Sequence, residues 1–290
     1  MKVIVAGGTG FLGEPLVKRL VARGDEVLVL SRNPERVRAG RGVAWSAVDE
    51  AGSADAVINL SGENIGAGRW TAQRKRNILS SRVEATTALV TAIRRAREKP
   101  RVFISASAVG FYGLRGDDVL DESSPNGAGF LAAVTEAWEE AARRAEAVAR
   151  TVIFRFGVVL AKDGGALRQM MLPFRYGVGG PVGSGKQWLS WVDREDVIRA
   201  IEWAIDNPSV RGVYNVTSPE PVRSRDFARI LGRVMHRPSM LPTPGFALRL
   251  VFGEMADELL LGGQRVVPSR AVREGFSFRY PTLESSLRHD

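Results

Sequence analysis

The amino-terminal turn of the sequence is the feature that most constrains its fold. A short apolar run, Val3 to Ala6, is followed at once by Gly7-Gly8-Thr9-Gly10-Phe11-Leu12-Gly13, where a helical pattern begins. Such a run is typical of a strand buried on both faces of a parallel sheet. Glycines at this spacing allow a tight turn whose backbone amides approach a pyrophosphate. The turn predicts a dinucleotide-binding unit; an ordinary glycine-rich turn is the alternative. The expected cofactor contacts here are Gly7, Thr9, Gly10, Phe11, Leu12 and Gly13.

Strand-like and helix-like segments alternate along most of the chain. The predicted strands are residues 3–6, 26–30, 43–45, 56–60, 101–105, 151–156 and 212–216, and the predicted helices are 11–22, 72–96, 130–149 and 194–205. This alternation predicts an α/β fold, a Rossmann-type doubly wound parallel sheet. Little more than a loop fits between the third and fourth strands, so we expect no full helix there.

The pattern changes after Val216, where prolines separate short helical segments. We therefore expect an NADP-binding Rossmann domain over residues 1–216, with a substrate-cleft insertion near 164–193. Residues 217–290 are expected to form a smaller, mostly helical domain on the substrate side.

Composition excludes several classes of chemistry. The 290 residues include no cysteine and only two histidines, His236 and His289. Disulfides, thiol nucleophiles and histidine-rich metal centres are therefore excluded, and we expect no metal. The net charge is +9, but no recognition motif or interleaved aromatic pattern accompanies it, so no nucleic-acid partner is expected. Since no apolar stretch is long enough to span a bilayer, we expect a cytoplasmic protein without a membrane partner.

The end of the second predicted strand bears on the choice of cofactor. It continues as Ser31-Arg32-Asn33, without the carboxylate that usually meets the ribose 2′-hydroxyl of NAD. Ser31 can donate a hydrogen bond, Arg32 can pair with a 2′-phosphate, and Arg36 can add a second positive charge. The sequence therefore predicts NADP(H) as the cofactor; a solvated Arg32 in an ordinary loop is the alternative.

Several further motifs occur in a recognisable order. They are the stretches Val57 to Ile65, Ile104 to Gly113, Arg155 to Leu160, Gly183 to Trp188, Gly253 to Met255 and Gly263 to Val266. With these motifs the whole chain resembles the short-chain dehydrogenase/reductase superfamily, and specifically an atypical subgroup, the epimerase family or nucleoside-diphosphate-sugar epimerase-like proteins. The resemblance implies an extended-type fold that binds NADP(H) and carries a C-terminal helical domain.

The resemblance also implies further cofactor contacts. Leu60 and Ser61 correspond to residues that pass the adenosine side of the cofactor. Arg82 looks like a contact to a phosphate or ribose, although a surface helix residue in a basic stretch is the alternative reading. Val159 lies where related proteins offer backbone to the nicotinamide carboxamide.

The catalytic pair of typical superfamily members is absent. Those members use a tyrosine with a lysine four residues later, assisted by a serine or threonine, and none of the four tyrosines here has that partner. Ser107 resembles the assisting hydroxyl, Tyr112 could donate a proton, and Lys186 could clamp an anionic group or replace the missing lysine. Packing or solvated roles for these three are the alternatives. Trp188 and Trp191 are predicted to form a wall of the substrate cleft.

Two functions follow from these observations. The first is an NADP(H)-dependent oxidoreductase or epimerase acting on a small carbonyl, hydroxyl or nucleotide-sugar compound, which the retention of Ser107 and the tryptophan-containing loop favours. The second is a non-catalytic NADP(H) sensor or interaction protein, which the loss of the tyrosine–lysine pair favours.

Overall fold

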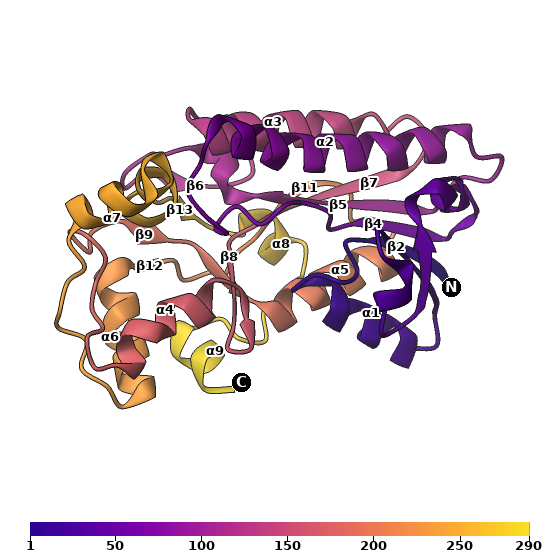
Figure 1. Ribbon diagram of the computed structural model, residues 1–290. Coiled ribbons are helices and arrows are strands. Elements are labelled where there is room, and N and C mark those ends of the chain that lie inside the picture. The colour runs from indigo at the N-terminus through magenta and orange to yellow at the C-terminus, as the bar shows by residue number, and fades with distance from the viewer. Residues whose placement is uncertain (290) are drawn as a thin grey trace.

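A seven-stranded parallel sheet forms the centre of the computed structural model, which describes residues 1–289 (Figure 1). The strand order is β11-β7-β5-β4-β1-β2-β3. The strands are β1 (Lys2–Ala6), β2 (Glu26–Ser31), β3 (Arg41–Ala44), β4 (Ala56–Asn59), β5 (Val102–Ala108), β7 (Arg150–Phe156) and β11 (Gly212–Val216). The chain order reverses direction at β1, as in a doubly wound fold, so the predicted fold class is confirmed.

Helices cover both faces of the sheet. Figure 1 shows α2 (Ala72–Arg95) and α3 (Phe130–Arg143) on one face, with α1 (Gly13–Ala22) and α5 (Arg194–Asp206) on the other. Alternate side chains of β1 serve the two faces, because Val3 and Val5 join the apolar cluster of α1 and α5 while Ile4 joins that of α2. A strand buried on both sides requires the unbroken apolar run that begins the sequence.

Two predicted boundaries can be compared with the structure. The connection from β3 to β4 contains only a 3₁₀ helix, η2 (Trp45–Ser53), so the expected absence of a full α-helix there is confirmed. By contrast, α3 ends at Arg143 rather than at 149. The chain tightens there, since the amides of Ala145, Glu146 and Val148 each bond the carbonyl three residues earlier.

Three small two-stranded sheets lie beside the main one. They are β8 (Val158–Ala161) with β10 (Trp191–Asp193), β9 (Trp188–Leu189) with β12 (Val222–Arg223), and β6 (Val119–Leu120) with β13 (Arg265–Val266). The last two join the C-terminal quarter of the chain to earlier segments. The remaining helices are η1 (Pro34–Arg36), η3 (Val109–Tyr112), α4 (Gly165–Arg175), α6 (Ser224–Met235), α7 (Gly245–Phe252), η4 (Ala256–Leu261), α8 (Ser269–Arg273) and α9 (Leu283–His289).

The region after residue 216 is mostly helical, as expected. Its separation into a domain of residues 217–290 stays a prediction, and Asp290 lies outside the described residues. Within residues 1–289, the structure contains no helix with both the length and the apolar character needed to cross a membrane.

Candidate cofactor and substrate site

The glycine-rich turn packs tightly against the end of β4. A Cβ atom on Gly7, whose φ is +80°, would lie 2.6 Å from the carbonyl oxygen of Leu60, and one on Gly13 would lie 2.1 Å from that of Gly7. The Gly10 amide donates a 3.0 Å bond to the Gly7 carbonyl, which closes the turn just before α1. Only glycine fits at Gly7 and Gly13, and the result is a compact turn at the start of a helix, the geometry that binds phosphates.

The other residues predicted in this turn occupy varied positions. Thr9 lines a cavity beside the turn, whereas Leu12 packs on the core at the start of α1. The Phe11 ring lies against Gly164 and Gly165 at the start of α4, where a Cβ on Gly165 would come within 2.8 Å of it. The guanidinium of Arg194 lies 5.1 Å from the centre of the Phe11 ring. The turn therefore holds the β8–α4 connection beside the predicted cofactor site.

The cavity beside the turn has a volume of about 390 Å³ and lies at the end of β2. Its polar lining includes Ser31, Asn33, Arg36 and Arg38. The Ser31 hydroxyl accepts a 3.1 Å bond from the Asn33 amide. Arg32 is exposed and does not line this cavity, so the arginines that line it are Arg36 and Arg38. Sequence reasoning missed Arg38, because its distance from the strand end gave no signal that the chain folds back.

The residues after β4 also suit a dinucleotide. The Ser61 hydroxyl oxygen is buried without a hydrogen-bond partner among the described residues, while its amide bonds the Asn59 side chain at 3.1 Å. A buried unpartnered hydroxyl costs free energy unless a ligand satisfies it. Leu60 is half-buried against the core, and Val159 lies in β8 opposite Val192 of β10. Together with the glycine cradle, the unpartnered Ser61 hydroxyl shows that these residues fit the predicted cofactor.

Arg82 points back toward the loop after β4. Its guanidinium donates to the carbonyl oxygens of Ile78 at 2.9 Å and Glu63 at 3.0 Å, and lies 5.2 Å from the centre of the Trp138 ring. Burial lowers the pKa of Arg82 to about 10, so the side chain keeps its charge at neutral pH. Glu63 itself forms a 2.8 Å ion pair with Arg74. Arg82 is thus a partly buried cation held against the loop after β4 rather than a solvated helix residue.

Ser107 and Tyr112 belong to a buried polar network between β5, α3 and β7. The Ser107 hydroxyl donates to Glu139 at 2.7 Å, and Arg155 donates to both oxygens of Glu139 at 2.7 and 2.8 Å. Arg155 also donates to the Tyr112 hydroxyl at 2.9 Å, and that hydroxyl donates to Asn215 at 2.7 Å. The structure therefore brings Ser107 and Tyr112 into one network through residues that sequence reasoning did not single out.

The buried position of Tyr112 determines its protonation. Burial raises the pKa of Tyr112 to about 12 although Arg155 partly opposes the shift. At neutral pH the phenol is therefore protonated and can only donate or accept a hydrogen bond, not act as a base.

The loop around Lys186 does not form the full cleft wall that the sequence predicted. Lys186 is exposed and takes no part in the network. The prediction that Trp191 forms a wall of the cleft is wrong, since its side chain is fully buried with Phe174 and Phe227. The indole N–H of Trp191 donates to the Glu220 carbonyl at 3.0 Å, which allows burial without an unsatisfied donor. Trp188 remains half-exposed.

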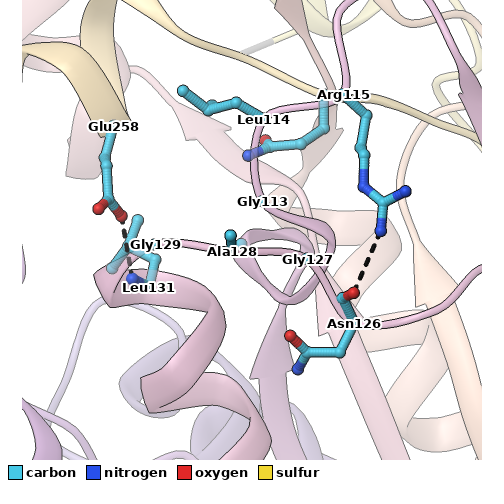
Figure 2. A pocket seen from close by; sticks show the side chains of 11 residues that line it. Gly113, Leu114, Arg115, Asn126, Gly127, Ala128, Gly129, Leu131 and Glu258 are labelled. Atoms are coloured by element: carbon cyan, nitrogen blue, oxygen red, sulfur yellow. Dashed lines mark hydrogen bonds between the residues drawn. The ribbon is translucent and has the colours of Figure 1, made fainter.

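A larger cavity of about 600 Å³ opens beyond β5 (Figure 2). Residues of two segments, Gly110 to Arg115 and Asn126 to Leu131, line it together with Glu258 and Gln264 from the C-terminal region. The Glu258 carboxylate accepts bonds from the amides of Phe130 at 2.8 Å and Leu131 at 2.9 Å, and so caps the start of α3. No sequence signal indicated Glu258.

Comparison with known proteins defines the family. Residues 3–217 match the NAD dependent epimerase/dehydratase family, and residues 243–289 match a domain of unknown function, DUF1731. The chain belongs to the NAD dependent epimerase/dehydratase family. Within this epimerase/dehydratase family it is similar to the Epimerase family protein SDR39U1 homolog, chloroplastic, of Arabidopsis thaliana, with 41% identity over 99% of this chain and 86% of that protein. It is also similar to the Epimerase family protein YfhF of Bacillus subtilis, with 40% identity over 99% and 97% of the two chains.

A solved structure of another epimerase/dehydratase family relative extends this similarity to three dimensions. The crystal structure of the human epimerase family protein SDR39U1 (isoform2) with NADPH superposes with a TM-score of 0.93 at 36% identity, covering 99% of this chain and 98% of that one. The resemblance predicted from the sequence motifs is therefore confirmed.

Proposed function

We propose that the chain binds NADP(H) and acts as an oxidoreductase or epimerase on a small carbonyl, hydroxyl or nucleotide-sugar compound. The observation that carries this proposal is the glycine cradle, the turn from Gly7 to Gly13. At Gly7 and Gly13 any side chain would collide with a neighbouring carbonyl oxygen, so only glycine fits. The human relative, crystallised with NADPH, supports the choice of cofactor. Bound in the cradle, NADP(H) would supply or accept a hydride.

The chain's own groups would hold the cofactor at two ends. The amides around Gly10 and the start of α1 would bind the diphosphate. Ser31 and Arg32, joined by Arg36 and Arg38 at the cavity, would meet the 2′-phosphate. Ser61 and Arg82 would make polar contacts, while Leu60, Thr9, Phe11, Leu12 and Val159 would shape the cleft.

Calorimetric titration of NADPH and NADH tests this assignment. Arg32→Ala and Arg38→Ala should each weaken NADPH by about tenfold or more while leaving NADH nearly unchanged, because only NADPH carries the 2′-phosphate. Arg95→Ala, at the exposed end of α2, is the matched control. An equal loss for both cofactors would refute the assignment to that arginine. Absence of heat with NADPH and wild-type protein would refute the cofactor itself.

Ser107, Tyr112 and Lys186 are the proposed catalytic groups. Ser107 and, as a proton donor, Tyr112 would polarise the substrate oxygen, which requires each hydroxyl to exchange a bond of the buried network for one to substrate. Lys186, exposed in its loop, would clamp an anionic group. Turnover of ketones, aldehydes and nucleotide sugars, followed by the absorbance of reduced nicotinamide, should fall in Ser107→Ala but not in Ser105→Ala on the same strand. Equal turnover in both variants would exclude Ser107.

A non-catalytic NADP(H) sensor is the second candidate. It is favoured by the missing tyrosine–lysine pair and by the full engagement of Ser107 and Tyr112 in the network. Tight NADPH binding without turnover of any compound in the panel would support the sensor and contradict the enzyme.

A further inference from the structure

The 600 Å³ cavity contains a guanidinium without an acidic partner. Arg115 is half-buried and lines the cavity, and the one hydrogen bond that its side chain forms within residues 1–289 runs from Nη2 to the carbonyl oxygen of Asn126 at 3.1 Å. No carboxylate among residues 1–289 forms an ion pair with it. By contrast, Arg223 pairs with Asp117, two residues after Arg115, at 2.8 Å. Arg115 therefore presents an uncompensated positive charge to the cavity.

Asn126 adds a second unmet polar group. Its Nδ2 atom is buried without a hydrogen-bond partner in the described chain, and neither end of the side-chain amide is bonded. Whichever way the amide is turned, one donor and one acceptor are available to a ligand. Buried polar atoms are normally hydrogen-bonded, so Nδ2 has hydrogen-bonding capacity that the described residues leave unused.

Glycines fix the geometry between these two side chains. A Cβ on Gly127 would lie 2.0 Å from the carbonyl oxygen of Tyr112, and one on Gly113, whose φ is +60°, would lie 2.5 Å from that of Ala128. The two segments therefore lie directly against each other, as Figure 2 shows, and hold Arg115 and Asn126 together. A preorganised pair of donors loses little entropy when a ligand binds.

The carboxylate in the same cavity does not cancel this charge. Glu258 lies across the glycine-rich segments from Arg115 in Figure 2, and its two oxygens accept bonds from the first amides of α3. The positive end of the helix dipole therefore compensates Glu258 locally. Arg115 has no such compensation.

We propose that this cavity binds an anionic group, a carboxylate or a phosphoryl group, on the small substrate, through the Arg115 guanidinium and the Asn126 amide. The inference rests on the proposed function, since it assigns the substrate class of that site. The cavity begins at Gly110, just beyond the carboxyl end of β5, at the sheet edge where the glycine turn also opens. Ligands of doubly wound sheets bind at this edge.

Calorimetry with matched probe pairs tests the inference. Pyruvate is compared with methyl pyruvate, and dihydroxyacetone phosphate with dihydroxyacetone, in phosphate-free buffer. Saturating NADP⁺ occupies the proposed cofactor cradle so that anions cannot bind there. At least one anionic probe should bind about tenfold or more tighter than its neutral counterpart, and Arg115→Gln should remove the preference. Arg115→Lys should keep part of it, Asn126→Ala should weaken it, and Arg95→Gln should leave it intact.

The outcomes separate the inference from the proposed function. Equal binding of anionic and neutral probes to wild-type protein, no binding of any anionic probe, or a preference that survives Arg115→Gln overturns the inference; the wild-type comparison needs no variant to fold. The pair that shows the preference distinguishes carboxylate from phosphoryl. If NADP⁺ itself does not bind, the proposed function fails, while an Arg115-dependent preference in the protein alone still supports the anion site.

Discussion

Glu139 accepts four hydrogen bonds inside the fold, two at each carboxylate oxygen. The donors are Ser107, Arg143 and two nitrogens of Arg155, at 2.7 to 2.8 Å. Glu139 is fully buried and Arg155 is only 3% exposed. Complete bonding is what makes a buried ion pair tolerable, because desolvation of two charges is otherwise unfavourable. The network positions Ser107 and Tyr112, whatever further part they take.

Removing one partner of this pair should be severe. Glu139→Ala leaves the Arg155 charge buried without compensation and should lower the free energy of unfolding by about 3–5 kcal/mol. The neighbouring Glu140 has a side chain that is 70% exposed and pairs with Arg144, so Glu140→Ala should change the free energy of unfolding by less than about 1 kcal/mol. Urea denaturation measures both variants. Similar midpoints for the two would contradict a structural role for the network.

Tyr112 should make stability depend on pH in the alkaline range. Burial raises its folded-state pKa to about 12 from 10.0, so its contribution is complete below pH 10 and is lost as the pH rises toward 12. The wild-type protein should therefore lose more free energy of unfolding between pH 9 and pH 11 than Tyr112→Phe loses, by about 1 kcal/mol. Urea unfolding at both pH values measures this. Equal losses of unfolding free energy in wild type and Tyr112→Phe would show that Tyr112 has the same pKa in the folded and unfolded states.

Elements formed by residues close in sequence could be predicted, whereas contacts between distant segments could not. The β1–turn–α1 unit could be predicted because its apolar run and glycines act within a dozen residues. The cap on α3 could not, because Glu258 comes from 128 residues away and no local pattern connects the two. The prediction that Trp191 lines the cleft was wrong for a related reason. The sequence near a glycine-rich loop does not show whether an aromatic side chain faces a cleft or the core. Arg115, Asn126 and Arg38 likewise acquire meaning only through chain folding.

The cap supplied by Glu258 can be tested at the level of the helix. Glu258→Ala removes the acceptor for two amides and the negative charge at the start of α3, and should lower the free energy of unfolding by about 1–2 kcal/mol. Its neighbour Asp257 is half-exposed and bonds Arg249 at 2.8 Å, so Asp257→Ala is the matched control with little expected effect. Denaturant unfolding compares the two. An undiminished midpoint in Glu258→Ala would mean that water replaces the carboxylate without loss.

In the whole molecule, the C-terminal quarter of the chain completes the core of the sheet. Ala271 and Phe276 belong to the same buried cluster as Tyr214 and the strands of the sheet. Polar contacts reinforce this, since Asn215 donates to the Val267 carbonyl at 3.1 Å and Glu122 accepts from the Arg270 amide at 3.2 Å. The boundary predicted at residue 216 follows the change in sequence pattern, but many contacts cross it.

These contacts predict that residues 1–216 will not fold stably alone. Cutting after residue 216 exposes the apolar cluster around Tyr214 and removes β13, the partner of β6, together with the groups that satisfy Asn215 and Glu122. Hydrogen exchange should show strong amide protection of β11 in the full chain and little in the 1–216 fragment, because an edge strand that loses its packing opens readily. Adding the 217–290 fragment in trans should restore protection if the loss reflects missing contacts rather than misfolding. Full protection of β11 in the isolated 1–216 fragment would instead establish two independently folding domains.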